Sequence, residues 1–150
     1  VSLVERGGRV RSQVAPKGTG KALNCLLIEH VEQTAHLNTD ESPLYTTTGK
    51  GFASHDTVNH GAEEYARHDK ITGRLATTNT VEGFFGNTKR SIDGTHHHVS
   101  AKRLPFYLAE FDFKYNTRKT SDGERTVVGL RGVEGKRLML RRPVKATLSW

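Results

Sequence analysis

The sequence predicts an α/β fold, because short strand-like runs alternate with helical runs along its 150 residues. Three observations support this prediction. Two strand-like runs flank the pair Gly7-Gly8, and apolar stripes of helical period run through residues 21–32 and 100–117. A chain of this length is sufficient for one domain with its own core.

The first elements follow from turn signals and periodicity. The glycine pair predicts a tight hairpin between strands at residues 1–6 and 9–14. Residues 21–32 are expected to form a helix with one apolar face. The single cysteine, Cys25, lies in the apolar run of that helix and is expected to be a buried, inert thiol.

The middle of the chain is expected to contain strands and a loop. A short strand at residues 35–39 should end at Asp40, and another strand should cover residues 52–59. Residues 60–76 are polar and are expected to be a loop, with a short helical turn near residues 63–67.

Two further helices are predicted toward the C-terminus. The first covers residues 80–91, with residues 92–99 as its exit loop. The second covers residues 100–117, and Ser100 can cap it. Its apolar stripe consists of Leu104, Leu108, Phe111 and Tyr115.

The positive charge is concentrated at the C-terminal end. Residues 1–113 carry 13 Lys and Arg and 13 Asp and Glu, whereas residues 114–150 carry 10 and 3, a net charge of +7. The chain is therefore divided into a domain of residues 1–118 and a basic, partly extended segment of residues 119–150. Such a segment predicts nucleic acid as a partner, and a merely solvated tail is the alternative.

The sequence shows no feature of a membrane or secreted protein. It contains no run of 18 apolar residues and no signal-peptide pattern. We therefore expect a cytoplasmic protein with no membrane partner.

Residues 78–90 contain the most informative motif. Glu82 precedes Lys89 by seven positions, which places both side chains on one face of a helix. An acidic pair, Asp40-Glu41, follows a strand-like segment upstream. Two carboxylates on separate elements, with a lysine near one of them, suit a site that holds a divalent metal against a phosphodiester backbone.

Several blocks of sequence, in order, resemble the IS1595-type (ISXO2-like) family of insertion-sequence transposases. The blocks are Asn38-Thr39-Asp40-Glu41, His60-Gly61-Ala62-Glu63-Glu64-Tyr65, Thr78-Asn79-Thr80-Val81-Glu82-Gly83-Phe84-Phe85, Lys89-Arg90, Gly94-Thr95-His96, Val99-Ser100-Ala101-Lys102, and Glu110-Phe111 through Lys114-Tyr115-Asn116-Thr117-Arg118. The resemblance covers roughly residues 1–140. It is specific because the block around Glu82 and the Tyr-Asn-x-Arg block occur together.

The resemblance implies an RNase H-like mixed sheet flanked by helices and a DDE transposase site. Asp40 matches the second catalytic carboxylate and Glu82 the third, and both would be metal ligands, while Lys89 matches the basic residue that follows. The implied cofactor is Mg²⁺ or Mn²⁺ in a two-ion site that cleaves and transfers DNA strands at insertion-sequence ends. Nothing in residues 1–14 matches the family's first aspartate, so the first strand is interpreted as missing and the chain as inactive by itself.

The implied partner is DNA, both transposon ends and target, bound by a homo-oligomer in the bacterial nucleoid. The residues interpreted as DNA-binding are Lys89, Arg90, Lys102, Arg103 and Arg118. A non-enzymatic basic nucleic-acid-binding domain with the same fold is the alternative. A third interpretation is that another chain supplies the first carboxylate.

Structural roles compete with these assignments. The spacing of Asn79 and Glu82 is that of a capping box, and Asp40 alone would be a strand-end turn residue. Asn116 is at least as consistent with a structural role at a helix end as with DNA contact. For His60, a surface or hydrogen-bonding role is favoured over that of a neighbour of the site. Residues 96–98, three consecutive histidines, favour loop packing or phosphate contact over a zinc site, because no second ligand cluster accompanies them.

Overall fold

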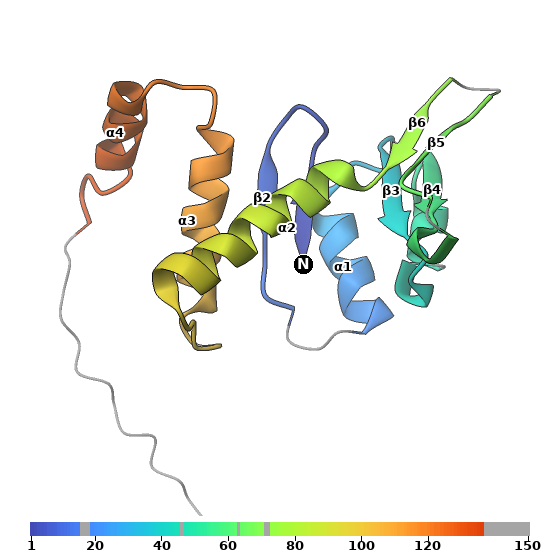
Figure 1. Cartoon of the computed structure of the whole chain (residues 1–150), viewed down its shortest axis with the longest axis horizontal. Coiled ribbons are helices and arrows are strands. Elements are labelled where there is room, and N and C mark those ends of the chain that lie inside the picture. The colour runs from blue at the N-terminus through green and yellow to red at the C-terminus, as the bar shows by residue number, and fades with distance from the viewer. Residues whose placement is uncertain (16–18, 46, 63, 71–72, 137–150) are drawn as a thin grey trace, which may run out of the picture. The chain divides into compact units, whose positions relative to one another are not determined.

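The computed structural model of the chain describes residues 1–15, 19–45, 47–62, 64–70 and 73–136 (Figure 1). Residues 1–116 and 117–150 form two compact units, which are treated separately below. The first unit mixes helices with strands, as the sequence predicts, and its strands form three two-stranded sheets. The predicted single mixed sheet is therefore not continuous over the described residues.

The N-terminal hairpin is confirmed. Strand β1 (Ser2–Val4) pairs antiparallel with β2 (Val10–Ser12), and Leu3 lies opposite Arg11. Gly7 in the connection has φ = 74°, a left-handed conformation that glycine adopts without steric cost. The glycine pair is thus a correct turn signal.

Helix α1 (Gly20–His30) follows, as the apolar stripe predicts. It buries Leu23, Leu26 and Leu27 on one face. The expectation of a buried cysteine is wrong, since Cys25 is exposed. Cys25 lies two positions from both Leu23 and Leu27, and a separation of two residues turns a side chain about 200° around the helix axis.

The predicted strand before Asp40 is also confirmed. Strand β3 (His36–Asp40) pairs in parallel with β4 (Ser54–Val58), with Asp40 opposite Val58. Two 3₁₀ turns, η1 (Pro43–Tyr45) and η2 (Thr48–Gly51), lie between the two strands in sequence. Val58 is fully buried, which anchors the end of β4 beside Asp40.

A small hairpin replaces part of the loop that we expected at residues 60–76. After the 3₁₀ turn η3 (His60–Ala62), strand β5 (Ala66–His68) pairs antiparallel with β6 (Leu75–Thr77). The expected helical turn near residues 63–67 is wrong for the described residues there. All three residues of β5 are exposed, so no apolar alternation marks this strand in the sequence.

Two helices complete the first unit. Helix α2 (Asn79–Ser91) continues into a π-helical turn, η4 (Ile92–His96), and α3 (Leu104–Asn116) follows. The expected cap at Ser100 is wrong, because the helix begins only at Leu104 and turn residues 101–103 lie between. The Ser100 carbonyl accepts hydrogen bonds from the N–H groups of Arg103 and Leu104 in that turn.

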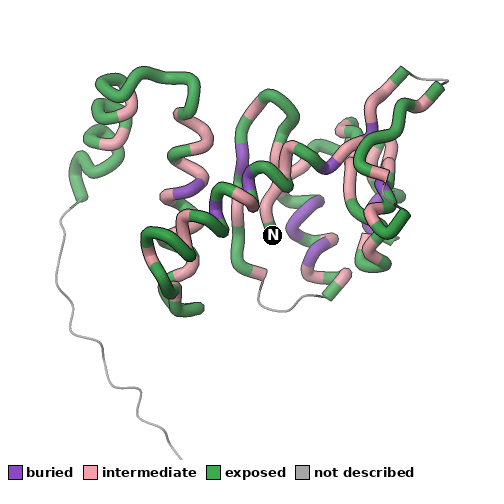
Figure 2. The backbone as a smooth tube through the Cα atoms, viewed as in Figure 1, coloured by how far each residue is buried: buried purple, intermediate pink, exposed green. Residues whose placement is uncertain are grey.

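The core of the first unit is small. Figure 2 shows buried positions on β2, α2 and α3, where Val10, Phe84 and Phe111 pack together. The Phe84 and Tyr115 rings meet edge to face, with centroids 5.4 Å apart. The predicted apolar stripe of the last helix of this unit therefore faces the core through Phe111 and Tyr115.

Side chains of α3 close the outer edge of β2. Asp112 accepts a hydrogen bond from the N–H of Ser12 at 2.6 Å and another from the Ser12 hydroxyl at 2.7 Å. Asn116 accepts from the N–H of Val10 at 2.7 Å and donates to the Val10 carbonyl at 2.9 Å. These two side chains supply the partners that a neighbouring strand would otherwise supply, and the structural role of Asn116 is confirmed.

Replacing Asn116 by Ala should reduce the free energy of unfolding by about 2–3 kcal/mol, because the half-buried N–H and carbonyl of Val10 lose their partners. The free energy of unfolding of Asn116→Asp should lie between those of the unaltered chain and Asn116→Ala, because a carboxylate can accept a hydrogen bond but cannot donate one. Urea unfolding followed by circular dichroism measures both. Lys114→Ala, which removes only an exposed pair with Glu110, should change stability by less than about 0.5 kcal/mol. Equal losses in Asn116→Ala and Lys114→Ala would contradict the role assigned to Asn116.

The second unit contains a helix that the sequence analysis did not predict. Helix α4 (Asp122–Arg131) begins with a capping box, in which Ser121 Oγ accepts from the N–H of Glu124 and the Glu124 carboxylate accepts from the N–H of Ser121. The rest of the predicted basic segment, residues 137–150, lies outside the described residues. None of the described helices is long and apolar enough to cross a membrane.

Candidate functional site

The acidic pair lies where β3 ends. Asp40 Oδ1 accepts a hydrogen bond from the N–H of Ser42 at 3.2 Å, so Asp40 does act as a strand-end turn residue. Glu41 accepts from the N–H groups of His60 at 3.0 Å and Gly61 at 3.4 Å. These backbone hydrogen bonds, that from His60 above all, lower the pKa of the fully exposed Glu41 carboxyl because they stabilise its charged form.

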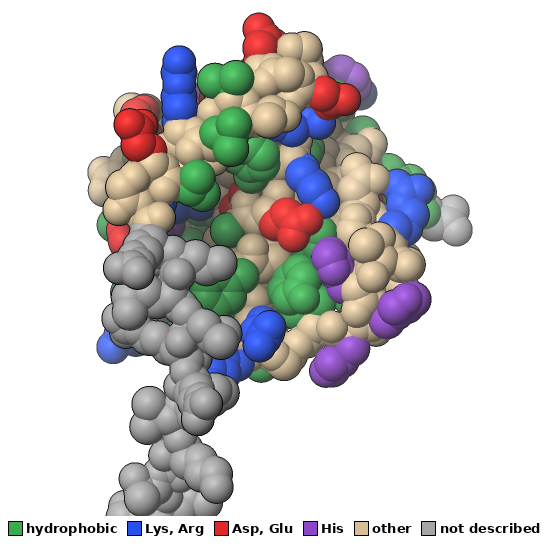
Figure 3. Space-filling model, turned by 90° about the vertical axis from the view of Figure 1, so that its left-hand side faces the viewer, with side chains coloured by type: hydrophobic (Ala, Val, Ile, Leu, Met, Phe, Trp, Pro, Cys, Tyr) green, Lys and Arg blue, Asp and Glu red, His purple; other side chains and the backbone are tan. Residues whose placement is uncertain are grey.

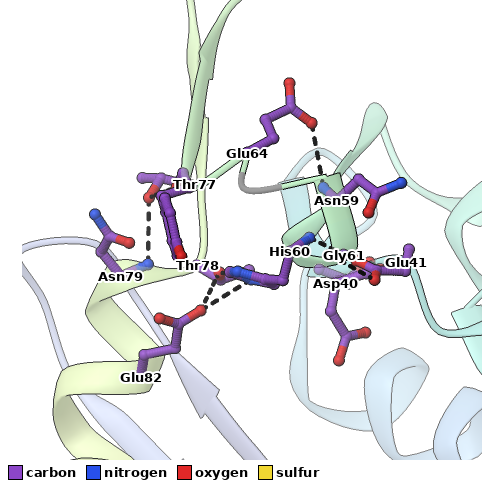
Figure 4. Close-up of polar contacts among 12 residues, drawn as sticks. Asp40, Glu41, Asn59, His60, Gly61, Glu64, Thr77, Thr78, Asn79 and Glu82 are labelled. Carbon is purple, nitrogen blue, oxygen red and sulfur yellow. Dashed lines mark hydrogen bonds and ion pairs between the residues drawn. The ribbon is translucent and has the colours of Figure 1, made fainter.

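Glu82 is held at the start of α2 by two side chains. Its Oε1 accepts a hydrogen bond from the Thr78 hydroxyl at 2.5 Å and lies 3.0 Å from Nε2 of His60 (Figure 4). The capping box that would pair Glu82 with Asn79 is absent, since the N–H of Asn79 bonds Thr77 Oγ1 at 3.2 Å. Glu82 Oε2 has no partner among the described residues.

His60 joins the two acidic elements. Its backbone N–H donates to Glu41, while its Nε2 lies 2.9 Å from the Thr78 hydroxyl oxygen as well as 3.0 Å from Glu82. The Thr78 hydroxyl donates its hydrogen to Glu82, so its oxygen can only accept from His60. Both neighbours of Nε2, the Thr78 hydroxyl and the Glu82 carboxylate, are therefore acceptors, and the tautomer that fits has the hydrogen on Nε2. His60 does form hydrogen bonds, as expected, but it is also a direct neighbour of Glu82, the role that the sequence disfavoured. Its link between β3 and α2 is an addition from the structure.

Asp40 and Glu82 open into the same cleft. It has a volume of about 1430 Å³ and is lined by residues of the strands β1, β2, β3 and β6 and of the helices α1, α2 and α3. Asp40, His60 and Glu82 all lie in its wall, and Figure 4 shows the His60 side chain between Glu82 and Asp40. Two carboxylates from separate elements are thus brought to one solvent-filled space.

The donor chemistry of this cleft suits a hard cation only in part. Carboxylate oxygens are the ligands that Mg²⁺ prefers, and both Asp40 and Glu82 are exposed. However, no three His, Cys, Asp or Glu side chains of the described ranges are grouped so that they could hold one ion. The described residues therefore fit a partial metal site.

The residues of the first unit that the sequence predicts to bind DNA lie away from the acidic end. Lys89 and Arg90 are exposed in the last turn of α2, and Lys89 is about 10 Å along the helix axis from Glu82. Lys102 and Arg103 are exposed just before α3, and Arg118 is exposed in the second unit. Figure 3 shows Lys and Arg interspersed with Asp and Glu over the face that it draws.

The first histidine of residues 96–98 packs against aromatic rings. Its ring centroid lies 4.7 Å from that of Tyr107 and 6.0 Å from that of Phe111. The loop-packing interpretation is confirmed for His96. His97 has φ = 54°, which marks the abrupt end of the π-helical turn.

A family of known proteins matches most of this chain. The sequence profile of the ISXO2-like transposase domain matches residues 1–116, which is more than half of the chain. No curated protein and no solved structure gives a significant match. The matched range contains the hairpin, both acidic elements and α3, and on this evidence the chain belongs to the family of ISXO2-like transposase domains.

Proposed function

We propose that this chain carries part of a DDE-type site for DNA strand cleavage and transfer at insertion-sequence ends, on an RNase H-like core. The observation that supports the proposal best is the convergence of Asp40, from the end of β3, and Glu82, from the start of α2, on one cleft. Family membership supports a DNA substrate. Assembly as a homo-oligomer on DNA in the bacterial cytoplasm is part of the same proposal.

Asp40 and Glu82 would hold Mg²⁺ or Mn²⁺, which would supply Lewis-acid stabilisation of the reacting phosphate oxygens. His60 and Thr78 bond the same oxygen of Glu82, Oε1, and so fix the orientation of the carboxylate. The other oxygen, Oε2, is left available as a ligand. We expect the two carboxylates to lie within reach of a metal pair, about 4–8 Å apart.

Exposed cations would bind the DNA phosphates. Lys89 and Arg90 continue the helix that carries Glu82, so a backbone that reaches the acidic end can follow α2 to them. Lys102, Arg103 and Arg118 would contribute further, sequence-independent contacts.

We expect no strand transfer by the 150-residue chain alone, because two carboxylates fix an octahedral Mg²⁺ poorly without a third ligand. The test is a cleavage and strand-transfer assay on insertion-sequence-end DNA with Mg²⁺ or Mn²⁺. Glu82→Gln is compared with Glu110→Gln, which alters a carboxylate paired with Lys114 in α3.

Cleavage by the unaltered chain that disappears only in Glu82→Gln would show that the site is complete without another carboxylate, and the inactivity proposed here would be wrong. Equal cleavage by all three proteins would contradict the role of Glu82.

A non-enzymatic nucleic-acid-binding domain is the second candidate. The net charge of +7 and the absence of a three-ligand group among the described residues favour it. The two candidate functions differ in how DNA binding depends on divalent metal. If Asp40 holds a metal ion, Asp40→Asn should abolish the part of DNA binding that requires that metal. If binding is purely electrostatic, the same substitution should leave it unchanged.

A further inference from the structure

Phe106, in the first turn of α3, is the most exposed large apolar side chain of the described residues. It is 76% exposed and takes no part in the core cluster that contains Phe111 of the same helix. Its ring also makes no contact with another aromatic ring of the described part of the chain. Single exposed apolar residues are common, so the meaning of this one depends on its surroundings.

Charged side chains surround the Phe106 ring. Residues three and four positions apart are neighbours on a helix surface, and the turn before α3 continues this spacing, since the N–H of Phe106 bonds the Arg103 carbonyl at 3.0 Å. The four neighbours are Lys102, Arg103, Ala109 and Glu110, of which three are charged. Protein–protein interfaces are depleted of charged residues at their centres. A ring in this setting therefore fits a nucleic acid better than another protein.

The two cations beside the ring are free to bind an anion. The side chains of Lys102 and Arg103 are exposed and have no ion pair or hydrogen bond with another described residue. The first turn of α3 contains no acidic residue that could pair with them. Positive charges are unfavourable at the N-terminus of a helix, so these two do not stabilise α3. Their position suits phosphate groups of a bound strand.

A small hollow of about 310 Å³ lies beside Phe106. Its lining residues are Arg103, Phe106, Tyr107 and Glu110. The Tyr107 ring is held against the ring of His96, with centroids 4.7 Å apart. The Glu110 carboxylate is paired with Lys114 Nζ at 2.6 Å, so its negative charge is compensated. Aromatic rings and a guanidinium group are the surfaces on which nucleobases stack.

We propose that Phe106 stacks against one unpaired base of a DNA strand whose neighbouring phosphates are bound by Lys102 and Arg103. Paired DNA does not fit, because both faces of a paired base are covered by the next bases in the stack. The site therefore selects single-stranded or locally opened DNA, and it does so with little regard to sequence, since every base has a flat face. The proposal rests on the DNA substrate of the proposed function but does not depend on the acidic cleft.

DNA titrations without divalent metal test the proposal with the full 150-residue chain. The probes are a labelled single strand of about 12 nucleotides and a blunt-ended duplex of the same sequence, and anisotropy measures their binding. Phe106→Ala and Phe106→Leu should each weaken single-strand binding by about tenfold and leave duplex binding unchanged. Leu keeps an apolar contact but has no flat ring, whereas Phe106→Tyr keeps the ring and should retain the affinity.

The matched control is Tyr65→Ala. It removes an aromatic side chain that is 58% exposed and lies outside the hollow, so it should leave both affinities unchanged. Equal single-strand affinity of Phe106→Leu and the unaltered chain would show an apolar contact without stacking and overturn the proposal. Duplex binding with no effect of any Phe106 substitution would overturn only the stacking site, whereas failure to bind either DNA would contradict the proposed DNA substrate as well.

A tryptophan at position 106 locates the base. Phe106→Trp is made in a chain whose only natural tryptophan, Trp150, is replaced by Phe. The single strand should quench the fluorescence of this tryptophan because a stacked base contacts the indole ring, and the duplex should not. Absence of quenching at saturating single strand would overturn the proposal. Sedimentation velocity tests the other occupant: self-association that is lost in Phe106→Ala, with unchanged single-strand affinity, would assign the ring to a contact between two copies and contradict stacking.

Discussion

Between 50 and 200 mM salt, the affinity of the chain for duplex DNA should fall by between about three and four orders of magnitude. Residues 114–150 carry 10 Lys and Arg against 3 Asp and Glu, a net charge of +7. If about seven phosphates are neutralised, the logarithm of the binding constant should fall with the logarithm of salt concentration with a slope of about −6. Titration of labelled duplex DNA at several salt concentrations measures this slope.

Charge-specific variants separate electrostatics from other effects of the C-terminal segment. One variant replaces four basic residues by Gln, namely Arg137, Arg141, Arg142 and Lys145. It loses four positive charges, and its slope should be reduced to about −3. Lys at positions 137, 141 and 142 keeps the charge and should leave the slope unchanged. An unchanged slope after the Gln substitutions, or after deletion of residues 119–150, would exclude this segment as the main DNA-binding element.

Replacing Phe111 by Ala should reduce the free energy of unfolding by about 3–5 kcal/mol. Phe111 is 5% exposed and packs against Val10, Phe84 and the ring of His96. Because these contacts join β2, α2 and α3, the cavity would affect most of the first unit. Urea unfolding followed by tyrosine fluorescence and far-ultraviolet circular dichroism measures the loss.

Phe106→Ala is the matched control for this prediction. It removes the same type of side chain from the same helix, two residues after Leu104. Phe106, however, is 76% exposed. Its effect should stay within about 0.5 kcal/mol. Complete loss of a cooperative transition in Phe111→Ala would agree with the prediction, whereas a destabilisation similar to that of Phe106→Ala would contradict it.

The elements that the sequence predicted correctly have local signals. The Gly7 turn marks the hairpin, and the apolar stripe through Leu23 and Leu27 marks α1. The β5–β6 hairpin was missed because its first strand is polar and exposed, so its pairing depends on the neighbouring strand. The start of α3 was placed too early because Ser100 has a capping side chain but forms a turn instead.

The residues that support the two carboxylates could not be predicted from the sequence. Asp40 and Glu82 were identified from their motifs, and both line the cleft. The contacts of His60 with Thr78 and Glu82 join residues 18 or more positions apart, so no local pattern reveals them. For Cys25 a local pattern was misleading. The apolar run around it suggested burial, but its position around the helix axis leaves it exposed.

The closure of the β2 edge by α3 has a consequence for how the chain is made. The bonded residues, Val10 and Asn116, are 106 positions apart. A ribosome adding about 5–20 residues per second therefore releases the hairpin about 5–20 s before its partner helix exists. A two-stranded hairpin is marginally stable by itself. The hairpin is thus stabilised only late in synthesis, and during this interval its bare edges are available to chaperones and to neighbouring nascent chains.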